Sequence, residues 1–72
     1  MDFEIKSFTI KKIQTARIEK NLSQEDLGHL IGRSSQYIEC FELGIQKFGI
    51  LNVLKFCEVL NLDPVEFYAD FN

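Results

Sequence analysis

The chain has 72 residues, of which 46% are hydrophobic, and a formal net charge of −3 at pH 7. A chain of this length forms one small domain with a marginal core, so association with a partner is expected. No stretch approaches the roughly 20 apolar residues of a membrane span, and the first residues lack the basic start and apolar run of a secretory signal.

The residues that usually carry catalysis or bind metals are scarce. His29 is the single histidine, and Cys40 and Cys57 lack the spacing of zinc ligands. There is no glycine-rich phosphate loop and no nucleophile and base at useful spacing. We therefore expect no enzyme activity, no metal and no cofactor, and free thiols in a reducing cytoplasm.

The charge is unevenly distributed along the chain. Residues 1–36 carry six Lys and Arg against five Asp and Glu, which is +1, and residues 37–72 carry two against six, which is −4. An acidic net charge weakens general attraction to phosphate. A nucleic-acid face would therefore lie on the first half of the chain, with the acidic second half turned away.

The first seven residues favour an extended segment. Phe3 and Ile5 alternate with charged residues, which is the period of a strand. Two interpretations stay open: a short strand paired with its copy in a partner subunit, and a loose arm.

A first helix is predicted from the next residues to about Lys20. Ser7 or Thr9 is a suitable N-cap, and Asn21 is a suitable left-handed stop. The inward stripe would consist of Ile10, Ile13 and Ala16 or Arg17, with Phe8 packing at the helix start.

Two short helices joined by a tight turn follow. Ser23 can cap the first of them, and Asp26 places negative charge at its N-terminus. Gly28 lacks a side chain, so another helix can approach closely there, and Gly32 can take the positive φ that ends a helix. The inward stripe of this helix is predicted to be Leu27, Leu30 and Ile31.

The second of these helices has equally clear limits. Ser34 is its predicted N-cap and Gly44 its predicted stop. Ile38 and Phe41 are its buried side. Two helices separated by a turn of about four residues with a glycine are typical of a helix-turn-helix.

The last part of the chain predicts two more helices. One runs from Ile50 to Leu60 with Cys57 as a small core residue, and Asn61 ends it. Asp63 and Pro64 then start a short fifth helix. The stripe of the fourth helix is predicted to be Ile50, Val53, Leu54, Cys57 and Leu60. The fifth helix is predicted to carry Val65, Phe67, Tyr68 and Phe71.

Three aromatic residues in the last six exceed what one side of a short helix can bury. Phe67, Tyr68 and Phe71 are therefore candidates for a dimer interface. The alternative is that they pack back onto the core of their own subunit.

A distributed pattern connects these elements to a known family. Its residues are Ser23-Gln24-Glu25-Asp26-Leu27-Gly28, Ile31-Gly32, Ser34, Tyr37-Ile38, Phe41-Glu42 and Gly44. Over about residues 8–68 the chain resembles the phage-repressor (Xre/Cro-type) DNA-binding domain. The resemblance implies an all-α fold, a compact five-helix bundle with the helix-turn-helix in helices 2 and 3. The whole chain would be one domain, with an arm before residue 8 and a tail over 69–72.

The resemblance also implies an ion pair between helices. Arg17 lies where the family places an arginine that pairs with a glutamate in the last turn of the second motif helix, here Glu42. Such a pair would fix the crossing of two helices, and removal of one partner would leave a buried charge. Two independent surface charges are the alternative.

The same resemblance assigns the DNA contacts. In this architecture the first residues of the second motif helix meet base edges in the major groove, which here gives Ser35, Gln36, Glu39 and Cys40. Phosphate contacts would come from Gln24, Arg33, Ser34, Tyr37 and Lys47, supplemented by Lys11 and Lys12. The second motif helix has no Lys or Arg, so a single subunit would bind weakly and a two-fold dimer would double its contacts.

Three functions are compatible with the sequence. The first is a dimeric, sequence-specific regulator that binds a palindromic operator in double-stranded DNA. The second is an antitoxin-like module that binds a toxin protein, which the acidic, aromatic tail would suit. The third is a pure protein-interaction domain, which the net charge of −3 permits.

Overall fold

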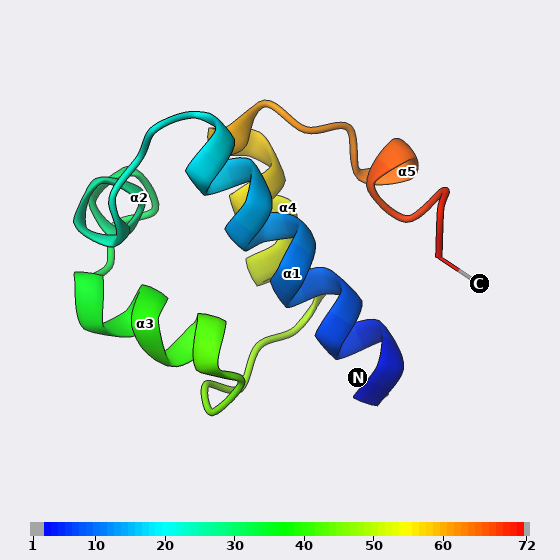
Figure 1. Ribbon diagram of the computed structural model, residues 1–72, viewed down its shortest axis with the longest axis horizontal. Coiled ribbons are helices and arrows are strands. Elements are labelled where there is room, and N and C mark those ends of the chain that lie inside the picture. Colours follow the sequence, from blue (N-terminus) through cyan, green and yellow to red (C-terminus); the bar gives the residue numbers. More distant parts are fainter. Residues whose placement is uncertain (1–2, 72) are drawn as a thin grey trace.

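The computed structural model describes residues 3–71 and contains five helices in this part of the chain (Figure 1). Their bounds are α1 Phe3–Glu19, α2 Gln24–Leu30, α3 Ser35–Leu43, α4 Ile50–Leu60 and α5 Pro64–Phe67. Helix α1 crosses the middle of the molecule and packs against α3 and α4, with α2 and α3 on one side and α5 on the other. The predicted all-α, five-helix fold is confirmed.

The extended N-terminal segment was a wrong expectation for residues 3–7. Helix α1 already begins at Phe3, so Ser7 and Thr9 lie inside it and cap nothing; residues 1 and 2 lie outside the described part. The early part of this helix is tied to the C-terminal segment by Thr9. The hydroxyl of Thr9, fully buried, donates to the carbonyl of Ile5 at 2.7 Å and lies 2.9 Å from the hydroxyl of Tyr68.

The predicted N-caps of α2, α3 and α5 are present. The Ser23 hydroxyl accepts from the Asp26 amide at 2.9 Å, and the Asp26 carboxylate accepts from the Ser23 amide at 3.0 Å, which completes a capping box. Ser34 caps α3 through the Tyr37 amide, and Asp63 caps α5 ahead of a proline at the first helical position. Each cap joins residues no more than three positions apart, so local sequence is sufficient to specify it.

The helix stops are also confirmed. Asn21 and Asn61 both have a φ of 58°, and Gly32 and Gly44 have φ values of 75° and 81°. These are the left-handed conformations that glycine and asparagine tolerate best.

The capping box predicts how the stability of the protein depends on pH. The hydrogen bonds from the Ser23 amide and hydroxyl lower the pKa of Asp26 from 3.8. A lowered folded-state pKa stabilises the protein above the unfolded pKa, and this stability is lost as the pH falls through the folded pKa. We expect Asp26→Asn to unfold more readily than wild type at pH 7 in urea, with the difference shrinking on acidification. A difference that stayed constant into acid would contradict this.

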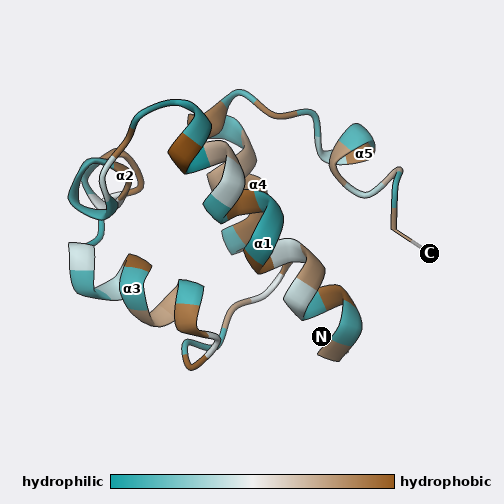
Figure 2. Cartoon of the chain, viewed as in Figure 1, coloured by the Kyte–Doolittle hydropathy of each residue, from teal (hydrophilic) through white to brown (hydrophobic). Residues whose placement is uncertain are grey.

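Most of the residues predicted to face inward are buried or half-buried, and three are exposed. In Figure 2, α1 and α3 alternate hydrophobic and hydrophilic residues, as expected for helices buried on one side. Leu30, Ile50 and Leu54 were predicted to face inward, but they are 46%, 56% and 40% exposed. Phe56 faces inward on α4 instead, and the centroid of its ring lies 4.7 Å from that of the Phe41 ring. The core consists of Ile13, Ala16, Leu27, Ile38, Phe41, Val53, Phe56, Cys57, Leu60 and Phe67.

The C-terminal aromatic residues pack within the subunit. Phe8 of α1 lies 6.3, 6.1 and 5.2 Å, between ring centroids, from Phe67, Tyr68 and Phe71. Phe67 is buried and the other two are half-buried. Packing back onto the core, the alternative left open by the sequence, therefore accounts for much of this cluster, and its role in a dimer stays a prediction.

Residues 3–71 contain neither a candidate membrane span nor a candidate metal site. None of the helices there has the length and apolar character needed to cross a bilayer. In the same residues no group of three or more His, Cys, Asp and Glu side chains lies close enough together to hold a metal ion. Burial raises the pKa of the Cys57 thiol, as expected for a core cysteine.

Candidate nucleic-acid interface

Helices α2 and α3 are held together at an unusually close contact. A Cβ atom added to Gly28 would lie 2.7 Å from the backbone oxygen of Ser34 and 3.0 Å from that of Arg33. Only glycine leaves room for the turn at this distance. A close approach at Gly28 is therefore present, but the backbone that approaches is that of the turn before α3 and not of another helix as predicted. The contact sets the position at which α3 begins.

The predicted base-reading residues lie on the outer side of α3. Ile38 and Phe41 are fully buried, which fixes the rotation of this helix about its axis. Ser35, Gln36 and Glu39 are exposed on its first two turns, and Cys40 is half-buried. The leading edge of α3 is thus open to solvent and is not packed against the body of the molecule.

The predicted phosphate-binding residues have different surroundings. Arg33 is exposed, and its guanidinium lies 5.0 Å from the centre of the Tyr37 ring. The Tyr37 hydroxyl accepts from the amide of Asn52 at 3.4 Å. The Ser34 hydroxyl is used as the helix cap, and Lys47 is exposed in the loop after α3.

Gln24 does not point freely to solvent. It is half-buried at the start of α2, and its amide donates to the carboxylate of Glu42 at 2.9 Å. The sequence assigned it to phosphate alone and missed this contact. An amide carries two hydrogens, so one bond to Glu42 does not exhaust its donor capacity.

The predicted pair between Arg17 and Glu42 is present. The two side chains meet at 2.7 Å and are only 13% and 4% exposed. Arg17 also donates to the backbone carbonyl of Leu22 at 2.8 Å, so one side chain ties α1, the α1–α2 connection and α3 together. The orientation of α3 therefore depends on a buried ionic contact.

Sequence reasoning missed three polar side chains that support this region. Gln14 donates to Glu42 at 3.2 Å, Lys6 donates to the carbonyl of Gly44 at 3.0 Å, and Asn52 supports Tyr37. Lys6 thus places a positive charge at the C-terminus of α3, where the helix dipole favours it. Only Gln14 had a sequence signal, because it lies three residues before Arg17 on the same helix.

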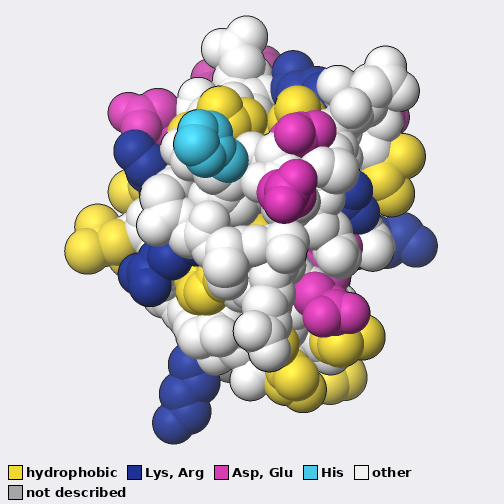
Figure 3. All heavy atoms as spheres, turned by 90° about the vertical axis from the view of Figure 1, so that its left-hand side faces the viewer, with side chains coloured by type: hydrophobic (Ala, Val, Ile, Leu, Met, Phe, Trp, Pro, Cys, Tyr) yellow, Lys and Arg dark blue, Asp and Glu magenta, His cyan; other side chains and the backbone are white. Residues whose placement is uncertain are grey.

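The face formed by α2 and α3 carries no concentrated positive charge. Figure 3 views the molecule from this side, and uncharged side chains and backbone fill its middle, with Lys and Arg scattered toward the edges among acidic groups. Any DNA affinity of this face would rely on hydrogen bonding and shape as well as on charge.

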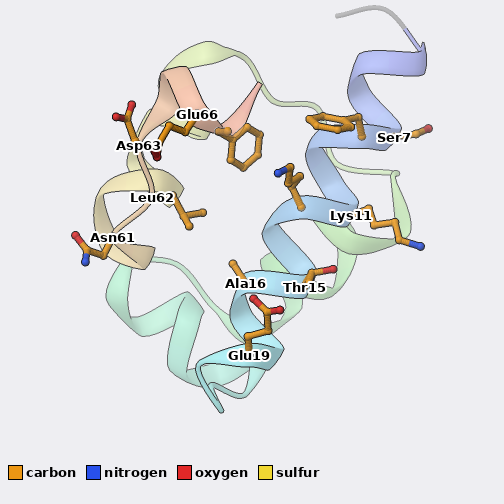
Figure 4. Close-up of a pocket in the computed structure, with 12 residues that line it drawn as sticks. Ser7, Lys11, Thr15, Ala16, Glu19, Asn61, Leu62, Asp63 and Glu66 are labelled. Carbon is orange, nitrogen blue, oxygen red and sulfur yellow. The ribbon is translucent and has the colours of Figure 1, made fainter. Parts of the chain in front are cut away.

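A groove lies away from this face. It has a volume of about 780 Å³ and lies between α1 and the segment that runs from the end of α4 into α5 (Figure 4). Lys12 lines it, and its ammonium lies 5.5 Å from the Phe8 ring, 5.9 Å from the Phe67 ring and 3.7 Å from the Asp70 carboxylate. Lys12 is thus engaged with the C-terminal segment, which weakens its case as a supplementary phosphate contact.

A helix-turn-helix family model matches residues 13–67. The crystal structure of the wild-type restriction-modification controller protein C.Esp1396I is similar, with a TM-score of 0.82 and 25% identity over 94% of this chain and 88% of that one. A tyrosine-to-phenylalanine variant of the same controller gives a TM-score of 0.82 and 24% identity over 94% of this chain and 86% of that one. No curated protein sequence matches this chain.

These findings agree with the geometry. The matched segment begins inside α1 and ends with α5, so it contains both motif helices and the core that holds them. The Arg17–Glu42 pair, the Gly28 contact and the open edge of α3 all lie within it. The chain therefore belongs to the Xre-type helix-turn-helix family of DNA-binding transcriptional regulators.

Proposed function

We propose that this protein is a sequence-specific regulator that binds a palindromic operator as a dimer and reads it with α3. One observation carries the proposal: the leading edge of α3 is exposed while Ile38 and Phe41, on its other side, are fully buried. A helix held in this way can enter the major groove, which is wide enough to admit an α-helix. The likeness to a restriction-modification controller supports a regulator of that kind.

The chemistry of the exposed side chains suits base edges. Gln36 can pair with N6 and N7 of adenine, and Ser35 can bond to any base more weakly. Glu39 can accept from N4 of cytosine, and Cys40 can contact a thymine methyl group. Gln36 has the strongest discriminating chemistry of the four.

Phosphate contacts would come from the residues around the start of α3 and the loop after it. Arg33 and Lys47 supply the positive charges, and both are exposed. Ser34, Tyr37 and Gln24 supply hydroxyl and amide groups. Two charges per subunit give weak binding at physiological salt, which is why the proposal includes a dimer.

The dimer would bury apolar surface that the single subunit leaves exposed. Leu51 and Val65 are 78% and 80% exposed, on α4 and α5. The half-buried Tyr68 and Phe71 would adjoin such a contact only at their exposed edges, and Phe67 is 4% exposed. We expect Leu51→Glu to shift the protein toward monomer in sedimentation and to weaken binding to a two-half-site duplex.

The decisive experiment selects bound fragments from genomic DNA and repeats the selection with Gln36→Ala. We expect wild type to recover a palindromic sequence and the variant to lose discrimination at one position per half-site, by about 1–3 kcal/mol. The melting temperature should be unchanged because Gln36 is exposed. Thr15→Ala, an exposed position on α1, is the matched control and should recover the wild-type sequence.

Two outcomes would contradict the proposal. An identical recovered sequence with Gln36→Ala would remove that residue from the reading set. Affinity for all DNA that does not change with salt concentration would favour a protein-interaction domain, because phosphate binding releases counterions and depends steeply on salt.

A further inference from the structure

The two oxygens of the Glu42 carboxylate accept different numbers of hydrogen bonds. Its side chain is 4% exposed, and four donor contacts reach it from three residues. Within residues 3–71, Oε2 accepts only from Arg17 Nε, at 2.7 Å. Oε1 accepts from Gln24 at 2.9 Å, from Arg17 Nη2 at 3.2 Å and from Gln14 at 3.2 Å.

Three donors on one oxygen exceed its two lone pairs. A carboxylate offers about four acceptor sites, two on each oxygen. One donor can therefore leave Oε1 while the remaining two keep it satisfied. A buried carboxylate that lost more than this would be left short of donors, which is unfavourable.

The three donors differ in how readily they can leave. Arg17 supplies the neutralising charge and is also bonded to Leu22. Gln14 lies in the middle of α1, among residues that pack on the core. Gln24 is the first residue of α2, on the side of the molecule that carries the motif helices, so its amide is the one that can turn outward.

We propose that Gln14 is a positioning residue for DNA binding. When Gln24 turns from Glu42 to a DNA phosphate oxygen, Gln14 and Arg17 keep Oε1 of Glu42 fully bonded. Gln14 thereby strengthens DNA binding without contacting DNA. This inference rests on the proposed function, because it requires that Gln24 contact phosphate.

If Gln14 has this positioning role, its removal changes DNA affinity in a way that a purely structural role would not. Without Gln14, moving Gln24 would leave Oε1 with a single donor, so the phosphate contact would become less favourable. If Gln24 is already absent, no exchange takes place and Gln14 has nothing to replace. The effect of removing Gln14 must therefore depend on the presence of Gln24.

The experiment is a double-mutant cycle on DNA affinity. Gln14→Leu, Gln24→Ala, the double variant and wild type are titrated with the duplex recovered by wild type in the genomic selection. We expect Gln14→Leu to weaken binding by about fivefold per subunit, the size of one net hydrogen bond. The double variant should bind as tightly as Gln24→Ala alone. Thr15→Ala, next to Gln14 on α1 and exposed, should bind as wild type.

Each other outcome overturns the inference in a recognisable way. An unchanged affinity for Gln14→Leu means that Gln24 reaches phosphate without leaving Glu42, or does not reach it. If Gln14→Leu weakens DNA binding equally in the presence of Gln24 and in the Gln24→Ala variant, Gln14 only holds α3 in place. If Gln14→Leu lowers the melting temperature, Gln14→Met, which keeps the length of the side chain, must give the same pattern. Failure of wild type to select any DNA would instead refute the proposed function, and this inference with it.

Discussion

Arg17→Ala is expected to lower the free energy of unfolding by about 3 kcal/mol. The substitution removes the charge that neutralises Glu42, whose side chain is 4% exposed, and it removes the bond to the carbonyl of Leu22. The glutamines at positions 14 and 24 still donate to Glu42, but neither carries a charge. Urea unfolding at pH 7, followed by circular dichroism, measures the effect.

Two controls separate the buried charge from the loss of a long side chain. Adding Glu42→Gln to Arg17→Ala removes the unpaired charge and should recover part of the lost stability. Lys55→Ala breaks the pair between Lys55 and Glu58, which meets at 3.2 Å with side chains 52% and 72% exposed. That change should stay within about 0.5 kcal/mol. An Arg17→Ala protein as stable as Lys55→Ala would show that the ionic contact does not stabilise α3.

Gly28→Ala is expected to destabilise the protein by about 2 kcal/mol, although alanine is the better helix former. The new methyl group would lie 2.7 Å from the oxygen and 2.8 Å from the carbon of the Ser34 carbonyl, which are backbone atoms that no rotamer change can move. The start of α3 must shift, so DNA affinity should fall together with stability. Thermal unfolding and titration with the selected duplex measure the two effects.

Gly49 offers the matched control for this substitution. It is the N-cap of α4, with a φ of −127°, and among the described residues no atom beyond its two chain neighbours lies within 4 Å of an added Cβ. Gly49→Ala should therefore change stability by less than about 1 kcal/mol. If both alanine variants unfold at the same denaturant concentration, the close contact at Gly28 does not constrain the helix pair.

Much of the fold could be predicted because its signals are local. Ser23, Ser34 and Asp63 begin helices, and Asn21 and Gly44 end them, through hydrogen bonds and φ angles set by residues within a few positions. The ion pair and the candidate reading edge came from the resemblance to a family. The pair is present, and the reading role of the edge stays a prediction.

The wrong expectations concern the backbone before residue 8 and the inward faces of α2 and α4. The period-2 pattern at Phe3 and Ile5 suggested an extended segment, but residues 3–7 form the start of α1, and the buried Thr9 bonds to Ile5 one turn earlier and contacts Tyr68. On α4 an inward stripe could equally contain Leu54, four residues after Ile50 and three before Cys57, or Phe56, three residues after Val53 and four before Leu60. The ring of Phe41 decides between them.

The sequence by itself determined where α2, α3 and α4 begin and end, where α5 begins, and the family to which the pattern is similar. The side chains suited to reading bases stay a prediction from that resemblance. Only the tertiary structure decided that Gln24 and Gln14 share the Glu42 carboxylate, and that the C-terminal aromatic rings pack on Phe8. The reason is physical. A cap has its partner within the same turn, whereas an amide or an aromatic ring has many possible partners until distant helices are brought together.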